Sequence, residues 1–190
     1  VSVENGVLNI MEPVNKTQKT ISNNSMVSIY LSETTELKNI SVEDSGDLEL
    51  SGKLTLETMT IDTAYSYIDI IGNLNVTSDV SVKTELGDIN IEQLICGGSL
   101  NLNTDSGDIE CFGKIQGDLS AETGGGDILV SGTVTGNTML STYLGFIELD
   151  DITCSGNLSM NTGSGDIEFS GNIVGSLTAE TEGGDITASD

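Results

Sequence analysis

Aspartates that follow a glycine recur along the sequence, and they are its clearest candidates for binding a ligand. Six share one phase of a repeat of about twenty residues: Asp47 and the five candidate ligands Asp88, Asp108, Asp127, Asp166 and Asp185. If repeats stack at the ~4.8 Å spacing of paired strands, the carboxylates of the first three candidates form a column and those of the last two a shorter one. Ca²⁺, which takes six to eight oxygen ligands, suits such columns. In the interpretation that we favour, each Asp instead hydrogen-bonds its turn, and the chain holds no metal and no cofactor.

Catalytic chemistry has fewer candidates. Polysaccharide hydrolysis requires two carboxylates at a defined separation, and the adjacent Asp150 and Asp151 are the candidate pair. The chain has no histidine, which excludes Ser–His, Cys–His and His–metal chemistry. It also has no arginine, because all six of its basic residues are lysines. We therefore predict that no residue is catalytic, with a carbohydrate-active β-helix enzyme as the alternative.

Aromatic residues gather at two places where the repeated Gly-Asp turn is interrupted. Four of the seven aromatic side chains stand there: Tyr65, Tyr67, Tyr143 and Phe146. They replace small turn residues, so their rings are candidates to project into solvent and stack on sugars or on the side chains of a partner. The alternative is that they cover a gap or pack on a neighbouring loop.

The elements that position all these groups come from the repeat itself. The apolar residue of each Gly-Asp-Ile unit, or of its degenerate copy, returns in steps of 19 to 21 residues, at positions 48, 68, 89, 109, 128, 147, 167 and 186. Apolar residues alternate with polar ones around these positions in short runs broken by glycine. Period-2 alternation predicts short strands with one buried face, and a fixed period of this length predicts a repeat architecture.

One such unit is too small to bury a face alone, so the units must stack. We predict an all-β, single-domain parallel β-solenoid of about eight coils, wound right-handed because parallel crossover connections almost always are. An antiparallel sandwich is the rival fold, but it has no reason to keep register at twenty residues. A threonine three residues before each repeat glycine, or its substitute, predicts a structural ladder: Thr63, Thr84, Thr104, Thr123, Thr142, Thr162 and Thr181.

The Ser-Gly-Asp-Ile units, together with the segment 27–37 that leads into Ile40-Ser41-Val42, resemble a bacterial family of adhesin-type β-solenoids, a domain family of unknown function. The opening segment 3–10 also looks like the start of that family. The resemblance covers nearly the whole chain and departs from the family at Ser32, where members commonly have proline. It implies a surface-associated, adhesive role and no common catalytic residues.

Charge restricts the partners. Thirty acidic residues against six lysines give a net charge of −24, and no base follows residue 114. Such a surface repels nucleic acid and anionic lipid. We therefore expect a non-catalytic scaffold or adhesin that is extracellular or on the bacterial cell surface. Its partner would be a protein or glycan, and this segment would not insert into a membrane. A Ca²⁺-stabilised cell-envelope scaffold is a further alternative.

The chain is predicted to be one domain over 1–190, with an N-terminal cap in 1–36 and coils in 37–190. Apolar runs at 7–10 and 26–31 suggest a hairpin-like cap over the first coil. Cys111 shares an apolar phase and is expected to be buried. Cys96 and Cys154 share a phase but lie three coils apart, about 14 Å at the strand spacing and beyond disulfide reach.

Overall fold

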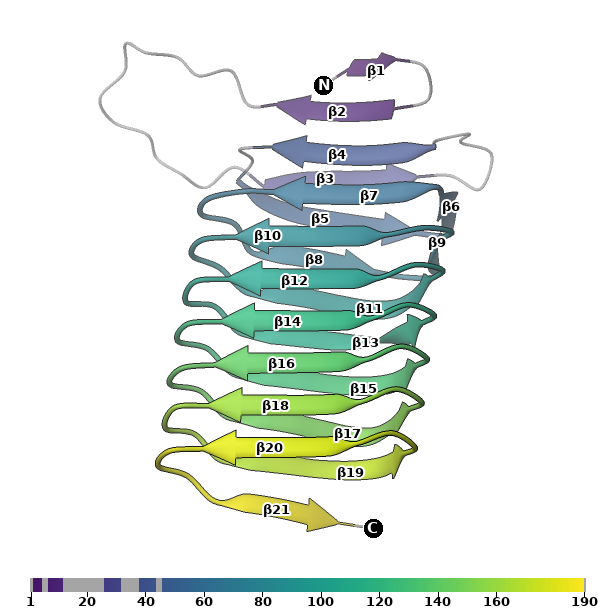
Figure 1. Cartoon of the computed structure of the whole chain (residues 1–190). Coiled ribbons are helices and arrows are strands. Elements are labelled where there is room, and N and C mark those ends of the chain that lie inside the picture. Colours follow the sequence, from purple (N-terminus) through teal and green to yellow (C-terminus); the bar gives the residue numbers. More distant parts are fainter. Residues whose placement is uncertain (1, 5–6, 12–25, 32–37, 44–45, 190) are drawn as a thin grey trace, which may run out of the picture.

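Two facing parallel sheets form a single stack of coils (Figure 1). The computed structural model describes residues 2–4, 7–11, 26–31, 38–43 and 46–189. Sheet A has ten strands: β1 (Ser2–Glu4), β2 (Val7–Met11), β4 (Asn39–Glu43), β7 (Thr58–Asp62), β10 (Val80–Thr84), β12 (Leu100–Thr104), β14 (Leu119–Thr123), β16 (Thr138–Thr142), β18 (Leu158–Thr162) and β20 (Leu177–Thr181).

Sheet B has eleven strands: β3 (Met26–Leu31), β5 (Asp47–Gly52), β6 (Leu54–Leu56), β8 (Ile68–Ile71), β9 (Leu74–Val76), β11 (Ile89–Cys96), β13 (Ile109–Ile115), β15 (Ile128–Val134), β17 (Ile147–Cys154), β19 (Ile167–Ile173) and β21 (Ile186–Ser189). Each coil contributes one strand to sheet A and one long strand, or two short ones, to sheet B. The predicted β-solenoid of about eight coils is confirmed, and the antiparallel sandwich is wrong.

The repeat period fixes the register between coils. Ile109 pairs with Ile128 and Leu100 with Leu119, and both contacts join parallel strands of neighbouring coils. In Figure 1 the front strands of sheet A run right to left and the strands of sheet B behind them run left to right as the chain descends. That sense of winding is right-handed, as expected from the preference of parallel crossover connections.

Inward-facing side chains make a continuous apolar core between the two sheets. Strand β12 alternates buried and outward residues along its length, and its Leu100 and Leu102 are almost fully buried. From sheet B, Ile109 and Cys111 contribute to the same layer and are fully buried. Because each layer stacks on the next, one strand pattern repeated along the chain is enough to bury a core that no single coil could enclose.

The long strands of sheet B bend where the repeat length varies. In β11 the ladder shifts register between Glu92 and Leu94, and Gln93 takes a positive φ of 58°. In β17 the extra residue is Asp151, with a φ of 50°. A residue in the left-handed region that leaves two positions facing one across the ladder is a β-bulge, and it absorbs the additional residue without displacing the core.

This bend also means that a count along the chain misaligns the columns. Leu74 and Ile115 each stand six residues after a repeat apolar position. In the structure Ile115 pairs with Cys96, while Leu74 pairs with Leu94. The register shifts once at the Gln93 bulge and once more at the break between β8 and β9, so the two residues lie two positions apart in the stack.

At the N-terminal end the apolar runs at 7–10 and 26–31 do not pair with each other. The first belongs to β2, which pairs in parallel with β4, and the second to β3, which pairs in parallel with β5. The antiparallel hairpin is formed by β1 and β2. The expected hairpin between the two runs is therefore wrong: each run extends a different sheet. Residues 1, 5–6, 12–25 and 32–36 of the predicted cap lie outside the described residues.

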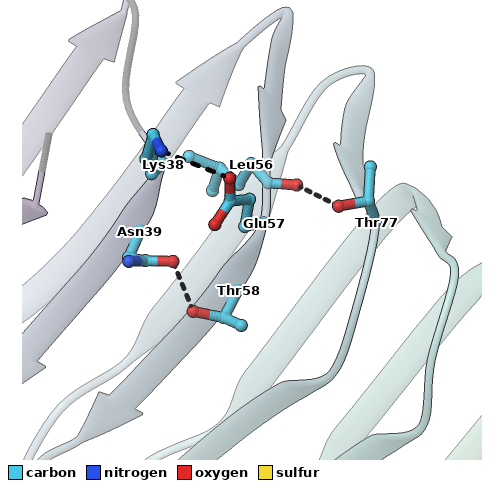
Figure 2. A network of polar contacts seen from close by, with 6 residues as sticks. All are labelled: Lys38, Asn39, Leu56, Glu57, Thr58 and Thr77. Carbon is cyan, nitrogen blue, oxygen red and sulfur yellow. Dashed lines mark hydrogen bonds and ion pairs between the residues drawn. The ribbon is translucent and has the colours of Figure 1, made fainter.

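Polar side chains also tie the first fully described coils together (Figure 2). The Thr58 hydroxyl donates to Oδ1 of Asn39 at 2.7 Å, and the Thr77 hydroxyl donates to the carbonyl of Leu56 at 3.2 Å. Lys38 and Glu57 form an ion pair at 3.7 Å. Both of its side chains are largely exposed, so the pair contributes at most about 1 kcal/mol, and the hydrogen bonds are the more specific links between coils.

Candidate functional site

The turns between sheet A and sheet B hold every candidate ligand of the Gly-Asp units. We call these turns the glycine corners; in the coil of β12 and β13 the corner is 105–108. They follow one another along the left edge of the stack in Figure 1. The turns from sheet B back to sheet A, such as 116–118, form the opposite corners.

The threonine ladder lies just inside the glycine corners. The Thr123 hydroxyl donates to the carbonyl of Gly107 in the preceding coil at 2.8 Å and accepts the N–H of Gly126 in its own corner at 3.2 Å. The same pair of bonds recurs at Thr104, Thr142 and Thr162. These hydroxyls are buried, and each one satisfies two backbone groups that water cannot reach. The predicted structural role of the threonines is confirmed.

The repeat aspartates hydrogen-bond to the backbone of the next coil. Oδ1 of Asp88 accepts the N–H of Asp108 at 2.9 Å, and Oδ1 of Asp108 accepts the N–H of Asp127 at 2.8 Å. Asp127 does the same for Phe146, and Asp166 for Asp185. One carboxylate oxygen of each of these Asp residues, apart from Asp185, thus holds the following corner in place. The sequence predicted a hydrogen bond within the Asp residue's own turn, and the observed backbone donor belongs to the next coil instead.

Metal binding would have to use the remaining oxygens of these columns. Within the described ranges, no three His, Cys, Asp or Glu side chains gather closely enough to hold a metal ion. The observed hydrogen bonds account for how like charges can follow one another along the corner, because each carboxylate faces a backbone donor and is partly or largely exposed.

A second ladder at the opposite corners escaped the sequence analysis. Oδ1 of Asp118 accepts the N–H of Asn137 at 2.7 Å, and Oδ1 of Asn137 accepts the N–H of Asn157 at 3.0 Å. Asp79 and Ser99 begin the same column. Its residue type changes from coil to coil, but every member has a short side chain with an acceptor oxygen, one position before the first residue of a sheet A strand. That shared property was the available signal.

Asp127→Asn tests whether the aspartates are needed as metal ligands or only as acceptors. An amide oxygen can replace the carboxylate oxygen, as Asn137 and Asn157 do at the opposite corners. We expect the variant to unfold within about 0.5 kcal/mol of the parent. We also expect the parent's thermal midpoint to be the same with and without a chelator. A midpoint that falls with chelator in the parent and not in the variant would contradict the acceptor role and identify a bound cation.

Asp150 and Asp151 lie at the bulge of β17, and both are exposed. Asp151 is the residue with positive φ, and its N–H donates to the hydroxyl of Ser170 at 2.8 Å. The pair thus occupies the position where the extra residue of this coil is accommodated.

The three cysteines are buried and free. Burial raises the pKa of the Cys111 thiol to about 12, and burial likewise raises the pKa of Cys96. The Cys96 thiol donates to the carbonyl of Ser78 at 3.3 Å. Because a thiolate is the reactive form, neutral buried thiols are core residues, as expected for Cys111.

The aromatic residues of the interrupted corners project into solvent. Tyr65 is 65% exposed, Tyr67 58%, Tyr143 68% and Phe146 43%. Two further apolar side chains are at least half exposed: Leu144 at the second interrupted corner, and Leu86 at the corner of the coil that follows the first. The corners therefore carry two apolar patches, one on the N-terminal half of the stack and one on the C-terminal half.

An open groove of about 840 Å³ runs along the glycine corners of the C-terminal half. It spans the ends of β12, β14, β16, β18 and β20, and Tyr143 lies at the middle of these coils. Asp105, Glu122, Glu180 and Glu182 are the acidic residues that line it. Of the predicted ligand-contact residues, the structure places Tyr143 in this groove; Tyr65, Tyr67 and Phe146 do not line it. The acids of the groove were not predicted.

Comparison with known protein families agrees with this geometry. Residues 2–139 and residues 100–190 each match the model of the Toastrack DUF4097 family, so the two overlapping matches span nearly the whole chain. Searches of curated proteins and of solved structures gave no match. No helix in the described part of the chain is long and apolar enough to cross a membrane. A family match over this length, together with the stacked parallel sheets, shows that the chain belongs to the Toastrack DUF4097 family of β-solenoid domains.

Proposed function

We propose that this chain is a non-catalytic interaction module, a rigid acidic rod that presents exposed aromatic corners to a partner at the bacterial cell surface. The observation that carries the proposal is the exposure of Tyr65, Tyr67 and Tyr143, each more than half accessible. Elsewhere the corners carry the Gly-Asp pair, whose Asp stabilises the stack. Large exposed rings add no such hydrogen bond between coils, and they are suited to stacking on a sugar or a partner side chain.

The rigidity of the rod supports a role in presentation. Both corners of each coil are hydrogen-bonded to the next coil through side chains and backbone, so the distance between the two aromatic patches is fixed. Tyr67 and Phe146 hold the same corner position four coils apart, about 19 Å at the strand spacing. A scaffold or adhesin benefits from such a spacing because a second contact on one ligand costs little further entropy.

The location and the partner class follow from charge. A net charge of −24 opposes binding to nucleic acid and to anionic lipid, which leaves a protein or a glycan as the partner. We place the module outside the cell, as its resemblance to adhesin-type domains implies.

A carbohydrate-active enzyme is the second candidate function, because the groove brings carboxylates beside an aromatic ring. Glycoside hydrolysis uses two carboxylates about 5–10 Å apart, one of which needs a raised pKa. We expect no turnover, and therefore no effect of Asp150→Asn or Glu122→Gln in a screen on acidic and neutral polysaccharides. Hydrolysis that either substitution abolishes would make this chain an enzyme.

The interaction role is tested with the double variant Tyr65→Ser and Tyr67→Ser. We expect it to fold normally, because both rings are exposed. The parent protein is first screened on glycan and matrix-protein arrays to find ligands that bind it. The affinity of the double variant for those ligands should be lower by about tenfold or more, since aromatic residues dominate binding energy at most interfaces. The measurements are thermal unfolding and array binding followed by titration.

The matched control replaces two exposed apolar residues outside the glycine corners, Ile95→Ser and Met139→Ser. If this control loses as much ligand affinity as the tyrosine variant, the loss comes from removing any exposed apolar side chain, and the corner is not the binding site. If neither variant alters binding of any ligand, the first aromatic patch has no role in recognition.

A further inference from the structure

The groove along the C-terminal glycine corners has an ordered arrangement of side chains. Successive coils place Asp105, Gly124, Tyr143, Gly163 and Glu182 at one position, directly after the ladder threonine. The exposed ring thus has a glycine in the coil on either side, and an acid two coils away in each direction. At the strand spacing those acids lie about 10 Å from the ring position and about 19 Å from each other.

The glycines leave the ring accessible. The Tyr143 ring leans over the next coil, where a Cβ placed on Gly163 would lie 3.1 Å from Cδ2 of the ring. On the other side, a Cβ placed on Gly124 would meet the backbone of Asp105 and not the ring. On the Gly124 side the floor of the groove beside Tyr143 is therefore bare backbone, and the ring is 68% exposed.

The carboxylates of the groove have no cationic partner within the protein. Asp105, Glu122, Glu180 and Glu182 are exposed. In the described part of the chain, the structure shows no ion pair or hydrogen bond to their carboxylate groups. No lysine lines the groove, and the chain has none after Lys114. An aromatic platform in a groove with unpaired acids at both ends is complementary to a ligand that carries several positive charges.

We propose that this groove binds an arginine-rich segment of a partner protein, held in an extended polyproline-type conformation. The proposal rests on the interaction role above and names its partner class. Arginine fits better than lysine because its planar guanidinium stacks on an aromatic ring and bonds a carboxylate through two N–H groups. In polyproline geometry, residues three apart lie on one face at about 9.3 Å, close to the two-coil spacing between Tyr143 and each flanking acid.

Arginines at positions i, i+3 and i+6 would thus meet Asp105, Tyr143 and Glu182 in turn. Glu180, on the adjoining edge of sheet A, would supply a further carboxylate at the third position. Glu122 lies one coil after Asp105 and would supply one between the first and second positions. Pro and Ser between the arginines would keep the backbone extended. A neutral glycan would leave the acids unpaired and is the less complementary ligand.

The test uses the whole chain and a nine-residue peptide, three repeats of Arg-Pro-Ser, titrated by calorimetry at low and physiological salt. We expect saturable binding that weakens with salt, because exposed charges are screened. Tyr143→Ser should weaken binding about five- to tenfold through loss of the cation–π contact. The pair Glu122→Gln and Glu182→Gln should weaken it about tenfold through loss of charge pairing.

The control pair Glu92→Gln and Glu110→Gln makes the same change in net charge on the outer face of sheet B. We expect it to alter the dissociation constant less than about twofold, since those acids lie outside the groove. If the control pair lost as much affinity for the peptide, the binding would come from the overall negative charge of the protein, and the proposal would be overturned. A peptide of the same composition with its arginines clustered at one end should bind more weakly, and equal binding would overturn the spacing.

An amino-sugar oligomer that binds more tightly than the peptide, and does so through Tyr143, would make the partner a glycan and overturn the peptide assignment. If the peptide fails to bind while array ligands still depend on Tyr65 and Tyr67, this inference fails and the interaction role stands. If neither binds, both fail.

Discussion

Gly126→Ala should destabilise the stack strongly, as should the same change at Gly107, Gly145 and Gly165, which repeat its geometry. A Cβ at Gly126 would lie well inside van der Waals contact with the carbonyl oxygen of Gly107 in the preceding coil. The atom in the way is backbone and is fixed by the ladders on both sides, so it cannot move aside as a side chain would. We expect a loss of about 3 kcal/mol or more in the free energy of unfolding, the upper range for overpacking.

The neighbouring glycine supplies a matched control. A Cβ at Gly125 would come no closer than 3.7 Å to its nearest atoms in the adjacent coil. Gly125→Ala should therefore change stability by less than about 1 kcal/mol. Urea or thermal unfolding followed by circular dichroism compares the two. For a chain of this size the loss at Gly126 corresponds to a midpoint about 6–12 °C lower. Similar midpoints for the two variants would show that coils can separate locally, against the close stacking described here.

Thr123→Val should have the second largest effect, although it leaves the shape of the side chain almost unchanged. The hydroxyl donates to Gly107 and accepts from Gly126, and all three residues are buried. Valine would leave a buried carbonyl and a buried N–H without this partner, which costs about 2–4 kcal/mol together. We expect a corresponding fall in the midpoint of denaturant unfolding at an unchanged m-value.

Thr123→Ser separates the hydroxyl from the methyl group. Serine keeps both hydrogen bonds and removes one buried methyl, which costs about 1 kcal/mol. The order of stability should thus be Thr, then Ser, then Val. If Val proved as stable as Ser, the threonine ladder would owe its recurrence to β-branched packing, and the hydrogen bonds across the corner would contribute little.

Much of this architecture follows from residue spacing alone. Ile109 and Ile128 are 19 residues apart and meet as direct partners, because a parallel stack converts sequence period into vertical alignment. Thr123 was predictable for the same reason, since it recurs at the one position where a corner needs a buried hydroxyl. A feature repeated in every coil is visible in the sequence even when each copy is short.

Features that vary between coils were harder to predict. The opposite-corner ladder alternates Asp, Ser and Asn, so it is recognisable by hydrogen-bonding capacity and not by identity. Counting along the chain misaligns Ile115 with Leu74 because the chain bulges at Gln93 and also changes register between β8 and β9, and both are properties of the backbone path. The groove depends on how the Tyr143 ring lies between two glycines, which needs coordinates to be seen.

The two corner ladders also determine how the length of a rod of this kind can change. The acceptors that one coil offers suit the donors of almost any other coil, so a duplicated stretch of one period could be inserted with its bonding needs already met. Height would then grow or shrink in whole increments of about 4.8 Å, while the width stayed constant. Single added residues are absorbed in β11 and β17 at the bulge, so that position is where small length polymorphisms between related genes should accumulate.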